Sequence, residues 1–195
     1  MGSTKRFLII ILIFLPMIDT FLPTEYEVPA TIGNYLKFED GDNTFRILSS
    51  PILGYEYWID TKDGKRQPIR KRMTEALDMS QIPDPDEVKH FWAMVVWNCD
   101  LKKIQILEIT QKSIQRILRG LAKNVKWGSP KEYDIVVNKT GKKMETRYTV
   151  TPDPKTPLDK EVEKEYKEKI IDLEALFTGG DPFETEKVNP DDIPL

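Results

Sequence analysis

The chain has 195 residues and 39% hydrophobic content, enough for one packed domain of roughly 110–150 residues with flanking tails. Its one Cys and one His exclude an intramolecular disulfide and a Cys/His zinc site, and the lone Cys favours a reducing compartment. The net charge of −3 conceals an asymmetry: residues 37–150 hold 21 Lys and Arg against 16 Asp and Glu, whereas residues 151–195 hold 6 against 13. A basic body with an acidic tail is typical of a protein that meets a polyanion.

Residues 1–18 form an apolar N-terminal segment. Lys5 and Arg6 precede nine consecutive apolar residues, 7–15, a pattern typical of secretory signals but too short to cross a bilayer as a helix. Two interpretations stay open: a signal or membrane-associating segment, or upstream sequence before a natural start at Met17. We favour the second, because the remaining sequence has the character of a cytoplasmic protein, and we expect no membrane partner.

The next part of the chain predicts strands. Residues 19–43 are polar and turn-rich and predict an extended arm. Alternating apolar residues in 44–49 and 52–58 predict one long, bent first strand, interrupted at Ser50-Pro51. After a turn at residues 62–65, an insertion at 65–90 is first basic and then acidic and Pro-rich. Residues 91–97 and 103–109 predict a second and a third strand, joined as a hairpin.

A helix and two strands follow. Ile114, Ile117, Leu118 and Leu121 fall at helical spacing after Thr110, a predicted N-cap. Basic residues lie on the other helix faces: Lys112, Arg116, Arg119, Lys123 and Lys126. We interpret the face with Arg116, Arg119 and Lys123 as solvated. Residues 133–137 and 146–150 predict the last two strands. This order predicts a mainly β (α+β) domain at residues 44–150, a five-stranded OB-type barrel with a helix between strands three and four, although a plain five-stranded α+β sheet would give the same order.

Residues 151–178 predict a linker and a C-terminal helix. Thr156 resembles an N-cap with Pro157 at the first helical position. One apolar stripe then predicts a single helix: Leu158, Val162, Tyr166, Ile170, Leu173 and Phe177. Residues 179–195 are acidic and poor in apolar side chains, so we expect this tail to be disordered.

The sequence offers little support for catalysis. It has one His, one Cys and no Gly-rich phosphate loop. Asp84, Asp86 and Glu87 have the spacing of a carboxylate site for Mg²⁺, but carboxylates in a Pro-rich loop are usually solvated. We therefore predict no catalytic residue, no metal and no cofactor.

Binding to a single nucleic-acid strand has more support, because such binding combines cations for phosphates with aromatic faces for unstacked bases. The predicted DNA-binding aromatic residues are Tyr55, Tyr57, Trp58 and Trp92; the predicted basic residues are Arg66, Arg70, Lys71, Arg72, Lys142, Lys143 and Arg147. Phe45, Phe91 and Trp97 are predicted core residues. Trp92 and Met94 point away from Trp97, onto a face that the C-terminal helix could cover, so both core and ligand roles stay open for Trp92.

The C-terminus carries the most specific motif: Asp191, Asp192, Ile193, Pro194 and Leu195. It resembles the tip of bacterial single-stranded DNA-binding proteins, in which Asp residues precede Ile-Pro-Phe at the free carboxylate; here the last residue is Leu. An apolar terminal side chain behind a rigid Pro can fill a small pocket while the carboxylates meet a basic rim. The resemblance implies that this tip recruits replication, recombination and repair proteins.

The body resembles phage-encoded single-stranded DNA-binding proteins in residues 45–48, 54–58, 105–111 and 133–135. That resemblance implies a non-enzymatic protein that coats single-stranded DNA in the cytoplasm of a host cell. An adaptor that binds proteins through an OB-like domain, without nucleic acid, is the alternative.

Overall fold

The structure, a computed structural model, describes residues 33–183. The N-terminal apolar segment, most of the predicted arm and the C-terminal tip lie outside the described residues. The elements are β1 (Tyr35–Leu36), β2 (Gly41–Ile47), β3 (Ile52–Asp60), β4 (Arg66–Arg72), β5 (Lys89–Asn98), β6 (Lys103–Ile109), α1 (Lys112–Lys123), β7 (Asp134–Thr140), β8 (Arg147–Pro152) and α2 (Lys160–Glu168). Short 3₁₀ helices lie at Met79–Gln81, Pro85–Glu87, Pro130–Glu132, Lys143–Glu145 and Leu173–Phe177. Within these ranges no helix has the length and apolar character needed to cross a membrane.

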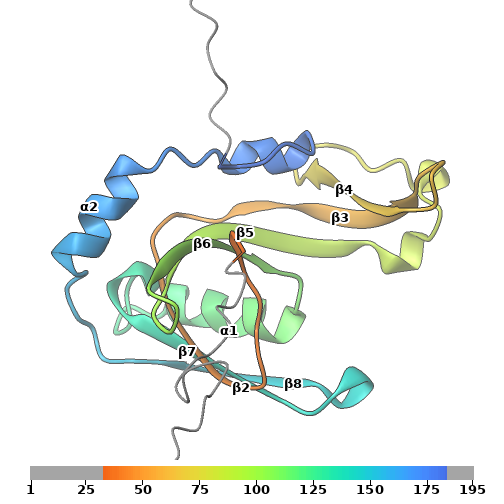
Figure 1. The fold of residues 1–195 in the computed structure, drawn as a ribbon. Helices are drawn as coiled ribbons and strands as arrows, with labels where there is room; N and C mark the ends of the chain where they lie inside the picture. Colours follow the sequence, from red (N-terminus) through yellow and green to blue (C-terminus); the bar gives the residue numbers. More distant parts are fainter. Residues whose placement is uncertain (1–32, 184–195) are drawn as a thin grey trace, which may run out of the picture. The chain divides into compact units, whose positions relative to one another are not determined.

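The strands form a single branched sheet (Figure 1). Its main path is β1-β6-β5-β2-β7-β8, and β3 pairs with the first half of β5 while β4 pairs with β3. All pairs are antiparallel except β1 with β6. β2 and β3 pair one after the other along the same edge of β5, Ile47 with Val96 and Ile52 with Ala93, so the predicted first strand continues past the Ser50-Pro51 interruption with a bulge.

The mainly β class is confirmed, but the closed five-stranded barrel is wrong: across residues 33–183 the sheet is open and has eight strands. Tyr35 and Leu36 pair in parallel with Ile106 and Leu107 and so occupy the outer edge of β6. At the other end of the path, β7 is the strand that pairs with β8 in the part of the chain that the structure describes. The insertion also contributes β4, which the sequence interpretation treated as loop. α1 does lie between the predicted third and fourth strands.

Two hydrophobic clusters stabilise the β5–β6 hairpin, one on each face. The first contains Met94, Val96, Leu107 and Ile109 with Ile114 and Leu118 of α1. The second contains Phe91, Val95, Ile104 and Ile106 with Val162, Leu173 and Leu176 of the C-terminal segment. The expectation that this segment covers the face of Trp92 and Met94 is therefore wrong, since it covers the opposite face. Phe45 and Phe91 are fully buried as predicted, and Trp97 is half-buried.

The predicted single C-terminal helix is also wrong. α2 ends at Glu168, and a separate 3₁₀ helix begins at Leu173 after Asp172, whose carboxylate accepts a hydrogen bond from the N–H of Glu174. Asp159, not Thr156, caps α2. Thr156 instead accepts hydrogen bonds from the buried Arg46 at its carbonyl (3.0 Å) and its hydroxyl (2.7 Å). Arg46 thereby ties the linker to the sheet. α1 likewise begins after Gln111, one residue beyond the predicted cap.

Candidate nucleic-acid interface

The β3–β4 hairpin divides the predicted aromatic and basic residues between its two faces. Tyr55 pairs with Lys71, and Trp58 pairs with Pro68. Because successive residues of a strand point to opposite faces, Tyr55, Tyr57 and Lys71 share one face. Trp58, Arg66, Arg70 and Arg72 share the other. The predicted site is therefore not a single surface.

The arginines on the Trp58 face are held by carboxylates. Arg70 is only 13% exposed and contacts Glu56 at 3.0 Å and Glu108 at 2.8 Å. Arg72 contacts Glu174 at 2.8 Å, and its guanidinium lies 4.7 Å from the centre of the Phe177 ring. Arg66 contacts Glu87 at 3.3 Å and lies over Trp58. These contacts orient the arginines within the fold and neutralise much of their charge, so this face is a weak phosphate site.

The opposite face carries a row of rings, which we call the aromatic track: Tyr57, Tyr55, His90 and Trp92. Tyr55 pairs with His90 across β3 and β5, and their ring centres are 5.7 Å apart. The His90 and Trp92 rings follow at 6.5 Å, and the Trp92 indole N–H donates to Nε2 of His90 at 3.0 Å. All four side chains are half-buried, which leaves part of each ring available for a base.

At Trp92 the aromatic track meets an apolar groove of about 400 Å³. Leu53, Trp92 and Leu118 line it, and Arg119, Lys123 and Lys131 border it. In residues 33–183 none of these three cations has an ion pair. Lys112 and Arg116 precede Arg119 and Lys123 on the same stripe of α1, because residues three and four apart share a helix face. We call these four residues the basic stripe.

The remaining predicted cations lie elsewhere. Lys142 and Lys143 belong to the β7–β8 turn, and Arg147 begins β8; all three are exposed. The turn requires Gly141, since φ is +78° and an added Cβ would lie 2.4 Å from the Glu145 carbonyl oxygen. Both this turn and the β3–β4 turn lie at the right of the view in Figure 1. The structure places these cations away from the lining of the groove.

Sequence reasoning missed part of this surface. His90, Arg119, Lys123 and Lys131 were not among the predicted binding residues, although they border the track and the groove. The sequence could have indicated two of these residues. Arg119 and Lys123 are four residues apart and flank Leu118, so helical spacing places two cations beside the apolar face of the helix. Asp84 is not gathered into a metal site: its carboxylate caps the Pro85–Glu87 turn, and no cluster of three metal-binding side chains occurs between residues 33 and 183.

Comparison with known proteins gives one informative relative. No family model and no solved structure matches the chain. The chain is similar to a phage protein. That relative is described as a probable ssDNA-binding protein of Escherichia phage T5 and is 24% identical over 140 residues. The match covers 60% of this chain and 53% of the relative, so the chain spans about half the length of the curated protein that it matches.

Proposed function

We propose that this protein binds single-stranded DNA and catalyses no reaction. The observation that carries the proposal is the aromatic track, which ends at a groove bordered by the α1 cations Arg119 and Lys123. Bases stacked on the track would contribute roughly 1–3 kcal/mol each, largely independently of sequence. Phosphates would lie along the basic stripe and release counterions on binding. The printed description of the phage T5 relative supports the same function.

The structure alters which predicted residues we assign to this function. Tyr55, Tyr57, Lys71 and Trp92 stay in the proposed site, and the groove adds Arg119, Lys123 and Lys131. Arg70 and Arg72 leave it because they are held by carboxylates. Lys142, Lys143 and Arg147 remain a secondary candidate, suited to phosphates of a longer strand.

We further propose that the protein coats single-stranded DNA during replication, recombination or repair in a host cytoplasm and recruits partners through the tip Asp191–Leu195. The tip lies outside the described residues, so its sequence alone supports this role. Its two Asp side chains and terminal carboxylate suit basic residues around a pocket on a partner protein, and Ile193, Pro194 and Leu195 suit the apolar interior of that pocket.

The first experiment is a titration with a fluorescently labelled thymidine oligonucleotide, followed by anisotropy at several salt concentrations. We expect binding that weakens steeply as salt rises. A protein that shows no binding at low salt would instead support the adaptor alternative.

Two matched variants then test which face of the hairpin binds. Tyr57→Leu removes a ring from the aromatic track, whereas Trp58→Leu removes the neighbouring ring from the opposite face. We expect Tyr57→Leu to weaken binding by about tenfold, the lower range for one stacked base, and Trp58→Leu to have little effect. The reverse order would place the DNA on the Trp58 face.

A further inference from the structure

The groove beside Trp92 lies on the same face of the sheet as the aromatic track. Leu53 pairs with Trp92 across β3 and β5. Because residues two apart on a strand share a face, Leu53 lies on the face of Tyr55, and Met94 lies on the face of Trp92. Leu118 of α1 lines the groove together with Leu53, Trp92 and Met94. A strand that stacks on the track therefore reaches the groove without crossing to another surface.

The interior of the groove is apolar. Its apolar lining, apart from Trp92, consists of Ile47, Pro51, Leu53, Met94, Leu118 and Ala122. Met94 is buried, with 1% of its surface exposed, whereas Leu53 is 39% exposed. The Ser49 hydroxyl, which also lines the groove, already accepts from the N–H of Val95 at 2.9 Å and donates to the carbonyl of Ser50 at 3.0 Å. Such an interior favours an apolar part of a ligand and disfavours a polar part that finds no hydrogen bond there.

The border of the groove is cationic. Arg119 and Lys123 approach it from α1, and Lys131 approaches it from the Pro130–Glu132 turn. All three side chains are exposed. These cations complement the charge of a phosphate backbone, and they offer hydrogen-bond donors but no acceptors. A base that enters the groove would therefore present an acceptor to its border and an apolar group to its interior.

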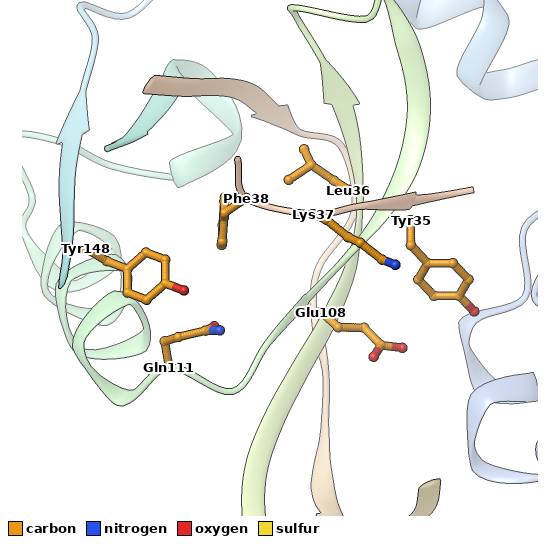
Figure 2. A pocket seen from close by; sticks show the side chains of 7 residues that line it. All are labelled: Tyr35, Leu36, Lys37, Phe38, Glu108, Gln111 and Tyr148. Atoms are coloured by element: carbon orange, nitrogen blue, oxygen red, sulfur yellow. The ribbon is translucent and has the colours of Figure 1, made fainter. Parts of the chain in front are cut away.

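The pocket between β1 and β8 has a different lining. Figure 2 shows the Glu108 carboxylate turned toward Tyr35 at one end, with the Gln111 amide apart from it near Tyr148. Lys37 is the cation among its lining residues. A carboxylate in the lining opposes a polyanion, so the charge of the two openings favours the groove beside Trp92 as the place for a base.

We propose that this groove is a base subsite of the single-stranded DNA-binding surface and that it selects thymine by its 5-methyl group. The proposal rests on the proposed function. Thymine carries a methyl group next to the acceptor O4. The methyl group would lie against Leu53 and Met94, and O4 would accept from Arg119 or Lys123. Adenine and cytosine carry an amino donor in place of O4, which these cations cannot accept, and guanine has no methyl group.

The same contact would separate DNA from RNA. Uracil, which takes the place of thymine in RNA, has the same hydrogen-bonding groups and lacks the methyl group. An apolar groove that holds this methyl group would therefore favour DNA through the base alone, without reading the 2′-hydroxyl of the sugar.

The test compares two oligonucleotides of equal length, one of thymidine and one of deoxyuridine. They have the same sugar, phosphates and hydrogen-bonding groups and differ in the 5-methyl group. We expect the thymidine oligonucleotide to bind about threefold to fourfold more tightly in an anisotropy titration, the gain for one buried methyl group.

Variants assign this ratio of affinities to the groove. Ala122→Leu fills the groove from the exposed side of α1 with a good helix former and should bring the ratio close to one. Leu53→Ala removes an apolar contact and should reduce the ratio. The matched control is Leu101→Ala, at a residue that is 45% exposed in the β5–β6 turn and outside the groove, and it should keep the wild-type ratio. Tyr57→Leu should weaken both oligonucleotides alike, because it removes a stacking ring and leaves the groove intact.

The possible outcomes separate this proposal from the proposed function. Equal affinity of the wild type for the two oligonucleotides would overturn the thymine subsite and leave the proposed function standing. A wild-type ratio that survives in both Ala122→Leu and Leu53→Ala would also overturn the subsite, since the methyl group would then act through stacking elsewhere. No binding of either oligonucleotide would overturn both proposals.

Discussion

Trp92 donates its indole N–H to Nε2 of His90, while Nδ1 of the same imidazole lies 2.8 Å from the carbonyl oxygen of Gly54. Because Nε2 accepts, the proton of the neutral ring is on Nδ1 and is donated to Gly54. His90 therefore links β3 to β5, and its hydrogen bonds fix the orientation of its own ring and of the Trp92 ring. The His90 and Trp92 rings of the track are therefore held by hydrogen bonds, and their orientations are set before any base arrives.

His90→Phe should test these hydrogen bonds. The ring is kept, but the Trp92 N–H and the Gly54 carbonyl both lose their partner, so we expect the free energy of unfolding to fall by about 1–3 kcal/mol in urea denaturation. His90→Gln keeps one donor and one acceptor and should lose less. Equal losses in the two variants would mean that the hydrogen bonds of His90 contribute nothing.

The basic stripe should determine part of the salt dependence of binding. Replacing Arg119 and Lys123 by Gln removes two cations that border the groove. Since each phosphate contact contributes about 0.7 to the slope of log K against log salt for a single strand, the magnitude of that slope should fall by about 1.4.

The matched control for the stripe is the double variant with Gln at Lys102 and Lys160. Both residues are exposed, and Lys102 lines a different pocket, near Asp159 and Glu161 at the start of α2. This control removes the same charge from another surface, so its slope should stay at the wild-type value. If both double variants changed the slope alike, the cations would act through net charge and not as a site.

Stability should depend on pH through Glu108. Burial is the largest cause that raises the pKa of this carboxyl above its ordinary value of 4.5; Arg70 lowers it and Glu56 raises it. A carboxyl with a raised pKa binds more protons in the folded state, so its contribution to stability is present below the ordinary value and is lost as pH rises through the folded pKa. Glu108→Gln does not titrate. Its unfolding free energy relative to the wild type should therefore rise between about pH 4 and neutral pH, as followed by urea denaturation.

The acidic tail should compete with DNA. Residues 184–195 hold four Asp and Glu against one Lys, and charge attraction of about 1 kcal/mol would reduce the affinity for oligonucleotide by roughly fivefold at low salt. Truncation after Phe183 should relieve that competition. The truncation point follows from the structure, because Phe183 packs against the second hydrophobic cluster and Pro182 accepts a hydrogen bond from Asp172. Unchanged affinity at low salt would exclude competition by the tail.

Local sequence patterns predicted several elements well. The strands around Phe91 and Ile104 and the helix after them occur where apolar periodicity placed them. Gly64, at a φ of +75°, makes the turn that Lys62 to Lys65 predicted. These features depend on side chains a few residues apart, which a sequence displays directly.

Features that depend on distant partners were not predicted. Tyr35 pairs with Ile106 on the outer edge of β6, so the sheet does not close as a barrel. No local pattern indicates that pairing. Likewise Arg70 was predicted to bind phosphate, because the sequence does not show that Glu56 and Glu108 hold it. For the aromatic candidates, alternation along a strand separates Tyr57 from Trp58 once the pairing is known.

Among residues 33–183, β4 pairs with β3 alone and leaves its other side as an edge of the sheet. Pro68 interrupts the backbone donors of this strand, and three consecutive cations, Arg70 to Arg72, follow it. Proline and like charges on an edge strand oppose its extension by a strand from another molecule. Molecules crowded side by side on one DNA strand would bring such edges together at high local concentration. The backbone donor that Pro68 lacks would then help to keep neighbouring copies from aggregating through their sheets.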